Sequence, residues 1–184
     1  FAMRAQLNTS ITYTIKNFSS GLSSLLFMSD TDIVVNISAN ANAAGPEGSG
    51  SPNTFTFNVN RSLKNGSSNT SEIVDVMVDY SVSGSGAFPA NMNDFDGDTF
   101  PHGTITFPAM MAIYNQTLTI NVNPDFVFEQ DEGFTVTLSN VRAFGGSGGN
   151  AANNTARLGG SSSATGTIRN DDVCLPLSIV YVDS

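Results

Sequence analysis

The chain of 184 residues lacks most of the side chains on which catalysis and covalent cross-linking depend. It has one cysteine, Cys174, so it cannot build an intrachain disulfide framework. Because it also has only one histidine, His102, it cannot form a zinc site from His and Cys ligands. The sequence contains neither the Gly-x-Ser-x-Gly nucleophile elbow nor a His-Glu-x-x-His motif that would give this histidine a catalytic role. We therefore expect His102 to lie in an exposed loop. These absences argue against an enzyme.

Positive charge is also scarce. Seven Lys and Arg stand against sixteen Asp and Glu, which gives a formal net charge of -9, although only 12% of the residues are charged. Nucleic acids and anionic membrane surfaces are bound through Lys and Arg, so we expect neither as a partner. The longest apolar stretches, residues 25–28 and 175–182, are far shorter than the roughly 18 residues that a membrane span needs, so no membrane insertion is expected.

What the chain does have is alternation of apolar and polar residues. Between residues 33 and 169 it predicts about seven strands and no amphipathic helix, which is typical of an antiparallel β-sandwich. Hydrophobic residues make up 40% of the chain, enough for one core. The sequence therefore predicts an all-β fold. The expected strands are residues 33–37, 55–61, 74–82, 104–107, 118–122, 134–138 and 164–168.

Three segments depart from this pattern. Residues 144–163 are rich in Gly and Asn and predict a long mobile hairpin loop, because they have too little apolar surface to offset their ordering entropy. Residues 1–31 form an N-terminal flank, the end of a preceding module, or a strand that joins the sandwich. Residues 173–184 are expected to link into a following module. The predicted domain therefore spans residues 32–172.

The acidic residues gather in a few predicted connections between strands. If the connections alternate between two ends of a sandwich, those after the first, third, fifth and last strands share one end. We therefore expect four acidic loops to converge there. They contain Glu47; Asp94, Asp96 and Asp98; Asp125, Glu129, Asp131 and Glu132; and Asp171 and Asp172.

Such convergence has an electrostatic cost. Two unit charges about 4 Å apart repel by roughly 4 kcal/mol at an effective dielectric constant of 20. Calcium would remove this cost, because it accepts six to eight oxygen ligands in flexible geometry, whereas magnesium demands a strict octahedron. The alternative is that these are ordinary turn residues, since Asp caps turns through hydrogen bonds to the backbone. The size of the set favours a cation.

One acidic run imitates a known calcium motif without matching it. Asp94-x-Asp96-x-Asp98 resembles the start of an EF-hand loop. However, Gly97 is its fourth residue and Ile105 its twelfth, where the EF-hand has glycine at the sixth position and a bidentate Glu at the twelfth. The sequence therefore excludes an EF-hand.

Six short motifs follow one another along residues 32–172. They are Pro46-Glu47-Gly48, residues 78–87 (VDYSVSGSGA), Asn93-Asp94-Phe95, residues 103–107 (GTITF), residues 128–140 (FEQDEGFTVTLSN) and residues 166–172 (GTIRNDD). In order and spacing they resemble the Calx-beta domain, the calcium-binding sandwich of sodium-calcium exchangers, which also occurs in integrin beta-4 and in bacterial surface proteins.

The resemblance implies an immunoglobulin-like sandwich of seven strands with calcium at one end. The ligands that it implies are Glu47, Asp94, Asp125, Glu129, Glu132, Asp171 and Asp172. Without these seven carboxylates the formal net charge would be -2 rather than -9. Pro124 and Asn170 stand where the family can have further aspartates, so we expect one to three ions rather than four.

The function expected from the sequence is a non-catalytic calcium-binding module of a secreted or cell-surface multidomain bacterial protein. Calcium would rigidify the end that joins neighbouring domains of the same chain. The alternatives are an adhesion module that binds carbohydrate or a cell-surface protein, and an accessory domain of a secreted hydrolase. Asp94 and Glu129 could serve glycoside hydrolysis, but such enzymes need a cleft and usually aromatic platforms, and the chain has no Trp.

Overall fold

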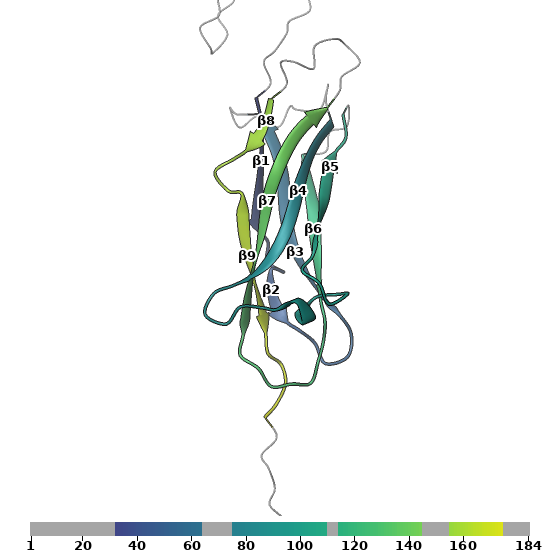
Figure 1. Ribbon diagram of the computed structural model, residues 1–184, viewed down its shortest axis with the longest axis vertical. Helices are drawn as coiled ribbons and strands as arrows, with labels where there is room; N and C mark the ends of the chain where they lie inside the picture. Colours follow the sequence, from purple (N-terminus) through teal and green to yellow (C-terminus); the bar gives the residue numbers. More distant parts are fainter. Residues whose placement is uncertain (1–31, 64–74, 110–113, 145–154, 175–184) are drawn as a thin grey trace, which may run out of the picture.

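The computed structural model describes residues 32–63, 75–109, 114–144 and 155–174 (Figure 1). The expectations for residues 1–31 and 175–184, and for residues 145–154 of the predicted loop, lie outside the described residues. Within the described ranges there are nine strands and one short 3-10 helix, η1 (Met92–Asp94). The strands are β1 (Asp32–Ala39), β2 (Ala44–Pro46), β3 (Asn53–Leu63), β4 (Asp75–Ser85), β5 (His102–Phe107), β6 (Asn115–Val122), β7 (Glu132–Phe144), β8 (Thr155–Leu158) and β9 (Ser163–Arg169).

The strands form two sheets. One has four strands in the order β6-β3-β1-β8, and the other has five in the order β2-β9-β7-β4-β5. The prediction of an all-β, immunoglobulin-like sandwich is confirmed. Five of the strand pairings are antiparallel, whereas β1 with β8 and β2 with β9 are parallel.

The difference between the expected seven strands and the nine observed has one cause. The first and the last strand each cross from one sheet to the other, so β1 and β2 are two parts of one strand, as are β8 and β9. Between β1 and β2 the chain turns at Asn40, whose carbonyl oxygen accepts from the N–H of Ala43 over 3.0 Å. The prediction of a loop is therefore wrong for residues 155–158. That strand is four residues long and pairs with the distant β1 at the edge of the four-stranded sheet, which local alternation does not reveal.

The core lies between the sheets and reaches into the acidic end. The ring of Phe134 packs edge-on against those of Phe55, Phe57 and Phe95, at centroid distances of 5.8, 5.9 and 5.5 Å. Phe95 belongs to the long connection after β4 rather than to a strand, yet it is fully buried. This aromatic side chain therefore anchors the loop that carries Asp94.

No helix in the described ranges is long and apolar enough to cross a membrane.

Candidate metal centre

Four connections meet at one end of the sandwich, the lower end in Figure 1. They follow β2, β4, β6 and β9, and they include residues 47–52, 86–101, 123–131 and 170–174. Each contributes carboxylates. This end of the fold therefore concentrates negative charge from four separate parts of the chain.

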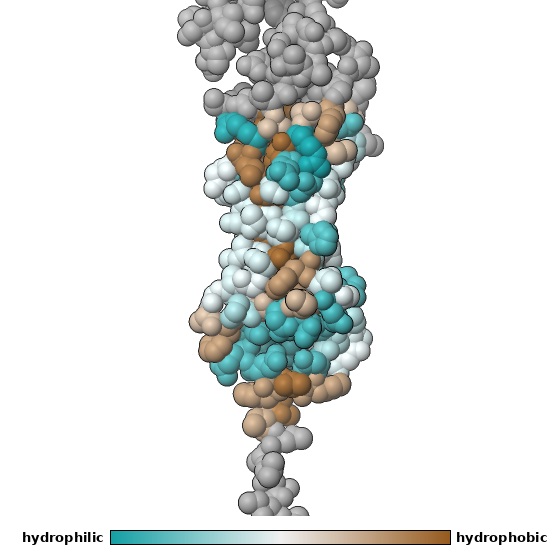
Figure 2. All heavy atoms as spheres, in the orientation of Figure 1, coloured by the Kyte–Doolittle hydropathy of each residue, from teal (hydrophilic) through white to brown (hydrophobic). Residues whose placement is uncertain are grey.

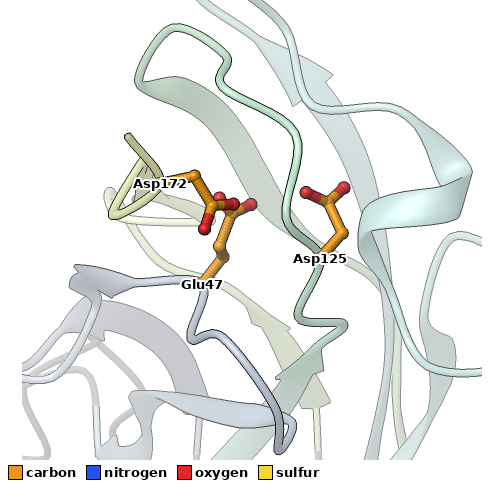
Figure 3. Close-up of side chains that lie close together, drawn as sticks. All are labelled: Glu47, Asp125 and Asp172. Carbon is orange, nitrogen blue, oxygen red and sulfur yellow. The ribbon is translucent and has the colours of Figure 1, made fainter. Parts of the chain in front are cut away.

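One group of three carboxylates comes from three of these connections. Glu47, Asp125 and Asp172 each present an oxygen, and the three oxygens lie within 4.8 Å of one another. Figure 3 shows the side chains of Glu47 and Asp172 directly beside each other, with Asp125 facing them. Glu47 is held at the end of β2 by its N–H, which donates to the Arg169 carbonyl oxygen over 3.1 Å. We call this set the first triad.

A second triad consists of Asp94, Glu129 and Glu132, whose oxygens also lie within 4.8 Å of one another. Asp94 ends η1, and both its oxygens accept hydrogen bonds from Asn91, from the backbone N–H over 2.5 Å and from the side chain over 3.2 Å. The Asn123 side chain donates to the carbonyl oxygens of Asn93 and Phe95 over 2.9 and 2.7 Å. The loop with Asp94 is thus fixed against the loop with Glu129.

Asp171 is the predicted ligand that joins neither triad. Its two carboxylate oxygens accept from the Gly48 N–H over 3.2 Å and from the Ser49 hydroxyl over 3.5 Å. The side chain is exposed, and it connects the turn after β2 to the segment that follows β9. Its role as a ligand stays a prediction, as do those of the six triad carboxylates.

Asn170 forms hydrogen bonds with the segments that carry the two triads. Its side-chain oxygen accepts from the Glu129 N–H over 3.1 Å, and its side-chain nitrogen donates to the Asp172 carbonyl oxygen over 3.0 Å. Its backbone N–H donates to the Asp131 carboxylate over 3.2 Å. Asn170 therefore connects the loop after β6 to the residues of both triads.

Sequence reasoning missed the amides that position the carboxylates. Asn91 forms a capping box with Asp94, and the spacing Asn-x-x-Asp before η1 is a local signal that could have shown it. Asn123 lies 28 residues from Phe95, and no local pattern links the two.

Burial and crowding raise the pKa values of these carboxyls. Desolvation, followed by the charges of Asp125 and Asp172, raises the pKa of Glu47 from 4.5 to about 7. Desolvation and a hydrogen bond with the Asp94 carboxyl raise the pKa of Glu132 to about 8. The pKa of Glu129 is raised as well, mainly by desolvation.

Asp79, on the outer face of the five-stranded sheet, shows the opposite effect. Hydrogen bonds from Arg142, at 2.8 Å, and from Thr104 hold the pKa of its carboxyl well below the usual range. For the acids of the candidate metal centre, no such cationic partner is among the causes of the pKa shifts.

Two oxygens in the first triad are buried without a hydrogen-bond partner, Glu47 Oε1 and Asp172 Oδ2. Glu47 is only 6% exposed. An orphaned, buried carboxylate oxygen is costly unless a cation or a proton satisfies it. The donor set contains only oxygen, which suits a hard divalent cation such as calcium.

Comparisons with known proteins find likeness only at the level of structure. No family model matches the sequence, and no curated protein matches it either. Among solved structures, the apo form of the Calx CBD1 domain is similar, with a TM-score of 0.52 and 24% identity over 77% of this chain and 99% of that one. The Calx CBD2 domain has a TM-score of 0.52 and 13% identity, over 78% of this chain and 91% of that domain.

The structure of CBD12 from CALX1.2 is also similar, with a TM-score of 0.51 and 23% identity over 75% of this chain. This chain covers 44% of that longer one. The chain therefore has the fold of the Calx CBD domains, and the resemblance found in its sequence is confirmed for the fold.

Proposed function

We propose that residues 32–172 form a non-catalytic calcium-binding module of a secreted or cell-surface multidomain bacterial protein. Residues 1–31 are its N-terminal flank or the end of a preceding module, and residues 173–184 link to a following one. Calcium binds at the two triads with Asp171 beside them, and it rigidifies the end at which the chain leaves the sandwich.

The first triad carries this proposal. Glu47 Oε1 and Asp172 Oδ2 are buried without a partner, and an oxygen of Asp125 completes a group within 4.8 Å. A calcium ion would satisfy both orphaned oxygens and offset the repulsion that raises the pKa of Glu47. The likeness to the calcium binding domain CBD12 of CALX1.1, at a TM-score of 0.50, supports the same interpretation.

The position of the triads supports the role at a junction. Asp172 is three residues after the end of β9, and Asn170 and Asp171 connect this exit to the loops before β3 and β7. An ion held by Asp172 would therefore restrict the exit segment relative to the sandwich.

Thermal unfolding in calcium, in magnesium and in EDTA tests the proposal. A ligand that binds only the folded chain stabilises it by about 2.7 kcal/mol at a free concentration of 100 Kd, so calcium should raise Tm strongly and magnesium much less. Glu47→Gln should reduce the calcium shift. Asp75→Asn is the matched control, since Asp75 begins β4 at the other end of the sandwich. Equal melting temperatures in calcium and EDTA would contradict calcium binding.

A further inference from the structure

The metal-binding end also carries most of the exposed large apolar side chains of the described residues. They are Phe126 (77% exposed), Val173 (75%), Val127 (58%), Phe88 (52%), Phe128 (52%) and Met92 (51%), and we call them the apolar rim. Phe144 is the other large apolar side chain in this group, and it lies at the opposite end of β7. Figure 2 shows hydrophobic side chains at the tip, beyond a hydrophilic band. Clustered apolar exposure of this kind marks a surface that something covers.

The rim contains a hollow next to the metal centre. Phe88 and Phe128 line it, together with Glu129 and Asn170, and its volume is about 390 Å³. Phe88 is held in place because its carbonyl oxygen accepts from the Gly133 N–H over 2.8 Å. Phe88 and Phe128 thus form the apolar part of a hollow that is otherwise lined by Glu129, Gln130, Asp131 and Asn170, just before β7.

The segment most directly available to fill it is the continuation of the same chain. Val173 belongs to the rim, and only Cys174 separates it from residues 175–182 (LPLSIVYV). They carry no charge and are almost entirely apolar. Eight extended residues reach roughly 26 Å, and a short tether gives an effective concentration in the millimolar range. The other apolar stretch, residues 25–28, precedes β1 in the sequence, and β1 begins at Asp32, at the end of the sandwich away from the rim (Figure 1).

We infer that residues 175–182 pack against the apolar rim, with Phe88 and Phe128 as their main contacts, and that calcium strengthens this packing. The calcium dependence rests on the proposed function. The loop after β6 contains both metal ligands and rim residues, and the Val127 N–H donates to the Asp125 carboxylate over 2.7 Å. Glu129 and Asp172 are likewise connected through Asn170. Binding an ion would therefore fix the rim and the exit of the segment together.

A single fluorescent reporter tests the inference in the full chain. The sequence has no Trp, so Ile179→Trp places the only indole in the segment. We expect a blue-shifted emission and a severalfold lower acrylamide quenching constant in calcium than in EDTA. Adding Phe128→Ser or Phe126→Ser should restore an exposed spectrum. Phe144→Ser is the matched control, an exposed Phe at the other end, and should change nothing.

Calcium binding measured by calorimetry on the same variants separates the two proposals. If calcium binds while the indole stays fully exposed, the proposed packing of residues 175–182 is wrong, and the proposed calcium-binding function is not affected. An indole protected equally in calcium and EDTA, and released by Phe128→Ser, would support packing and contradict its regulation by calcium. Protection that increases with protein concentration would show that a second copy covers the rim, and would overturn the intrachain contact.

Discussion

The backbone N–H of Gly48 donates a hydrogen bond to the Asp171 carboxylate over 3.2 Å, although 123 residues separate the two. This contact connects the turn after β2 to the exit after β9, and Glu47 and Asp172 lie on either side of it in the sequence. This hydrogen bond thus helps to bring together Glu47 and Asp172, the two residues of the first triad that have a buried oxygen without a partner.

The role of Asp171 can be divided by two substitutions. Asp171→Ala removes the acceptor for Gly48 and Ser49 and should destabilise the metal-free chain by about 1 kcal/mol. Asp171→Asn keeps an acceptor, so its melting in EDTA should stay near that of the unsubstituted chain. If Asp171 is a ligand, as we propose, both variants should lose most of the calcium shift. If Asp171→Asn keeps the full calcium-induced increase in Tm, Asp171 is not a ligand and serves only to hold the turn with Gly48 and Ser49.

Two triads predict two ions for each chain. Glu47→Gln and Glu132→Gln each remove one carboxylate from a different triad, so each should leave about one calcium bound. Isothermal titration calorimetry gives the stoichiometry, with Asp75→Asn as control. Loss of all binding in both variants would indicate one merged site in place of two.

Proton binding should oppose calcium. The pKa of Glu47 is about 7 and that of Glu132 about 8, so the folded, metal-free chain holds protons there more tightly than the unfolded chain does. Its unfolding free energy should therefore increase as the pH falls from about 8 toward 4.5. Asp79 has a lowered pKa and titrates below this range.

Urea unfolding in EDTA at several pH values checks this prediction. The double variant Glu47→Gln, Glu132→Gln should flatten the dependence, and calcium affinity should increase with pH over the same range. Greater stability of the metal-free chain at pH 8 than at pH 5 would contradict it.

We expect Arg61 to contribute to the free energy of unfolding but not to calcium binding. It is 1% exposed, and its guanidinium donates to the carbonyl oxygens of Phe107 and Pro108 over 3.2 and 3.1 Å. Its Cζ also lies 5.4 Å from the centroid of the Phe107 ring. Arg61→Met would remove these two hydrogen bonds, at a cost of roughly 1–3 kcal/mol each. Urea unfolding should show that loss, while the calcium shift stays the same.

A substitution at Gly166 tests the packing beneath the candidate metal centre. A Cβ at this position would lie 2.2 Å from Cζ of Phe134, whose ring contacts Phe95 and so supports the loop of Asp94. Gly166→Ala should cost about 1–3 kcal/mol or more, and should weaken calcium binding at the second triad. Gly160→Ala, with no atom within 4 Å of its Cβ, is the control for urea unfolding and calorimetry.

The strands with clear alternation were predictable because one face of each is buried. Phe55, Phe57 and Val59 of β3 all point into the core, as their spacing indicates. β2 and β8 were not predictable, since they are three and four residues long and owe their existence to pairing with β9 and β1.

The sequence by itself determined an acidic, all-β chain whose carboxylates fall in connections that share one end. Alternation and loop position are local properties, and they suffice for that conclusion. Only the tertiary structure decided which carboxylates lie together in each of the two triads. Asp125 and Glu129 are four residues apart on one loop, yet they belong to different triads. Their partners come from the turn after β2, the end of η1, the start of β7 and the exit after β9, and the distances between them depend on how the two sheets pack.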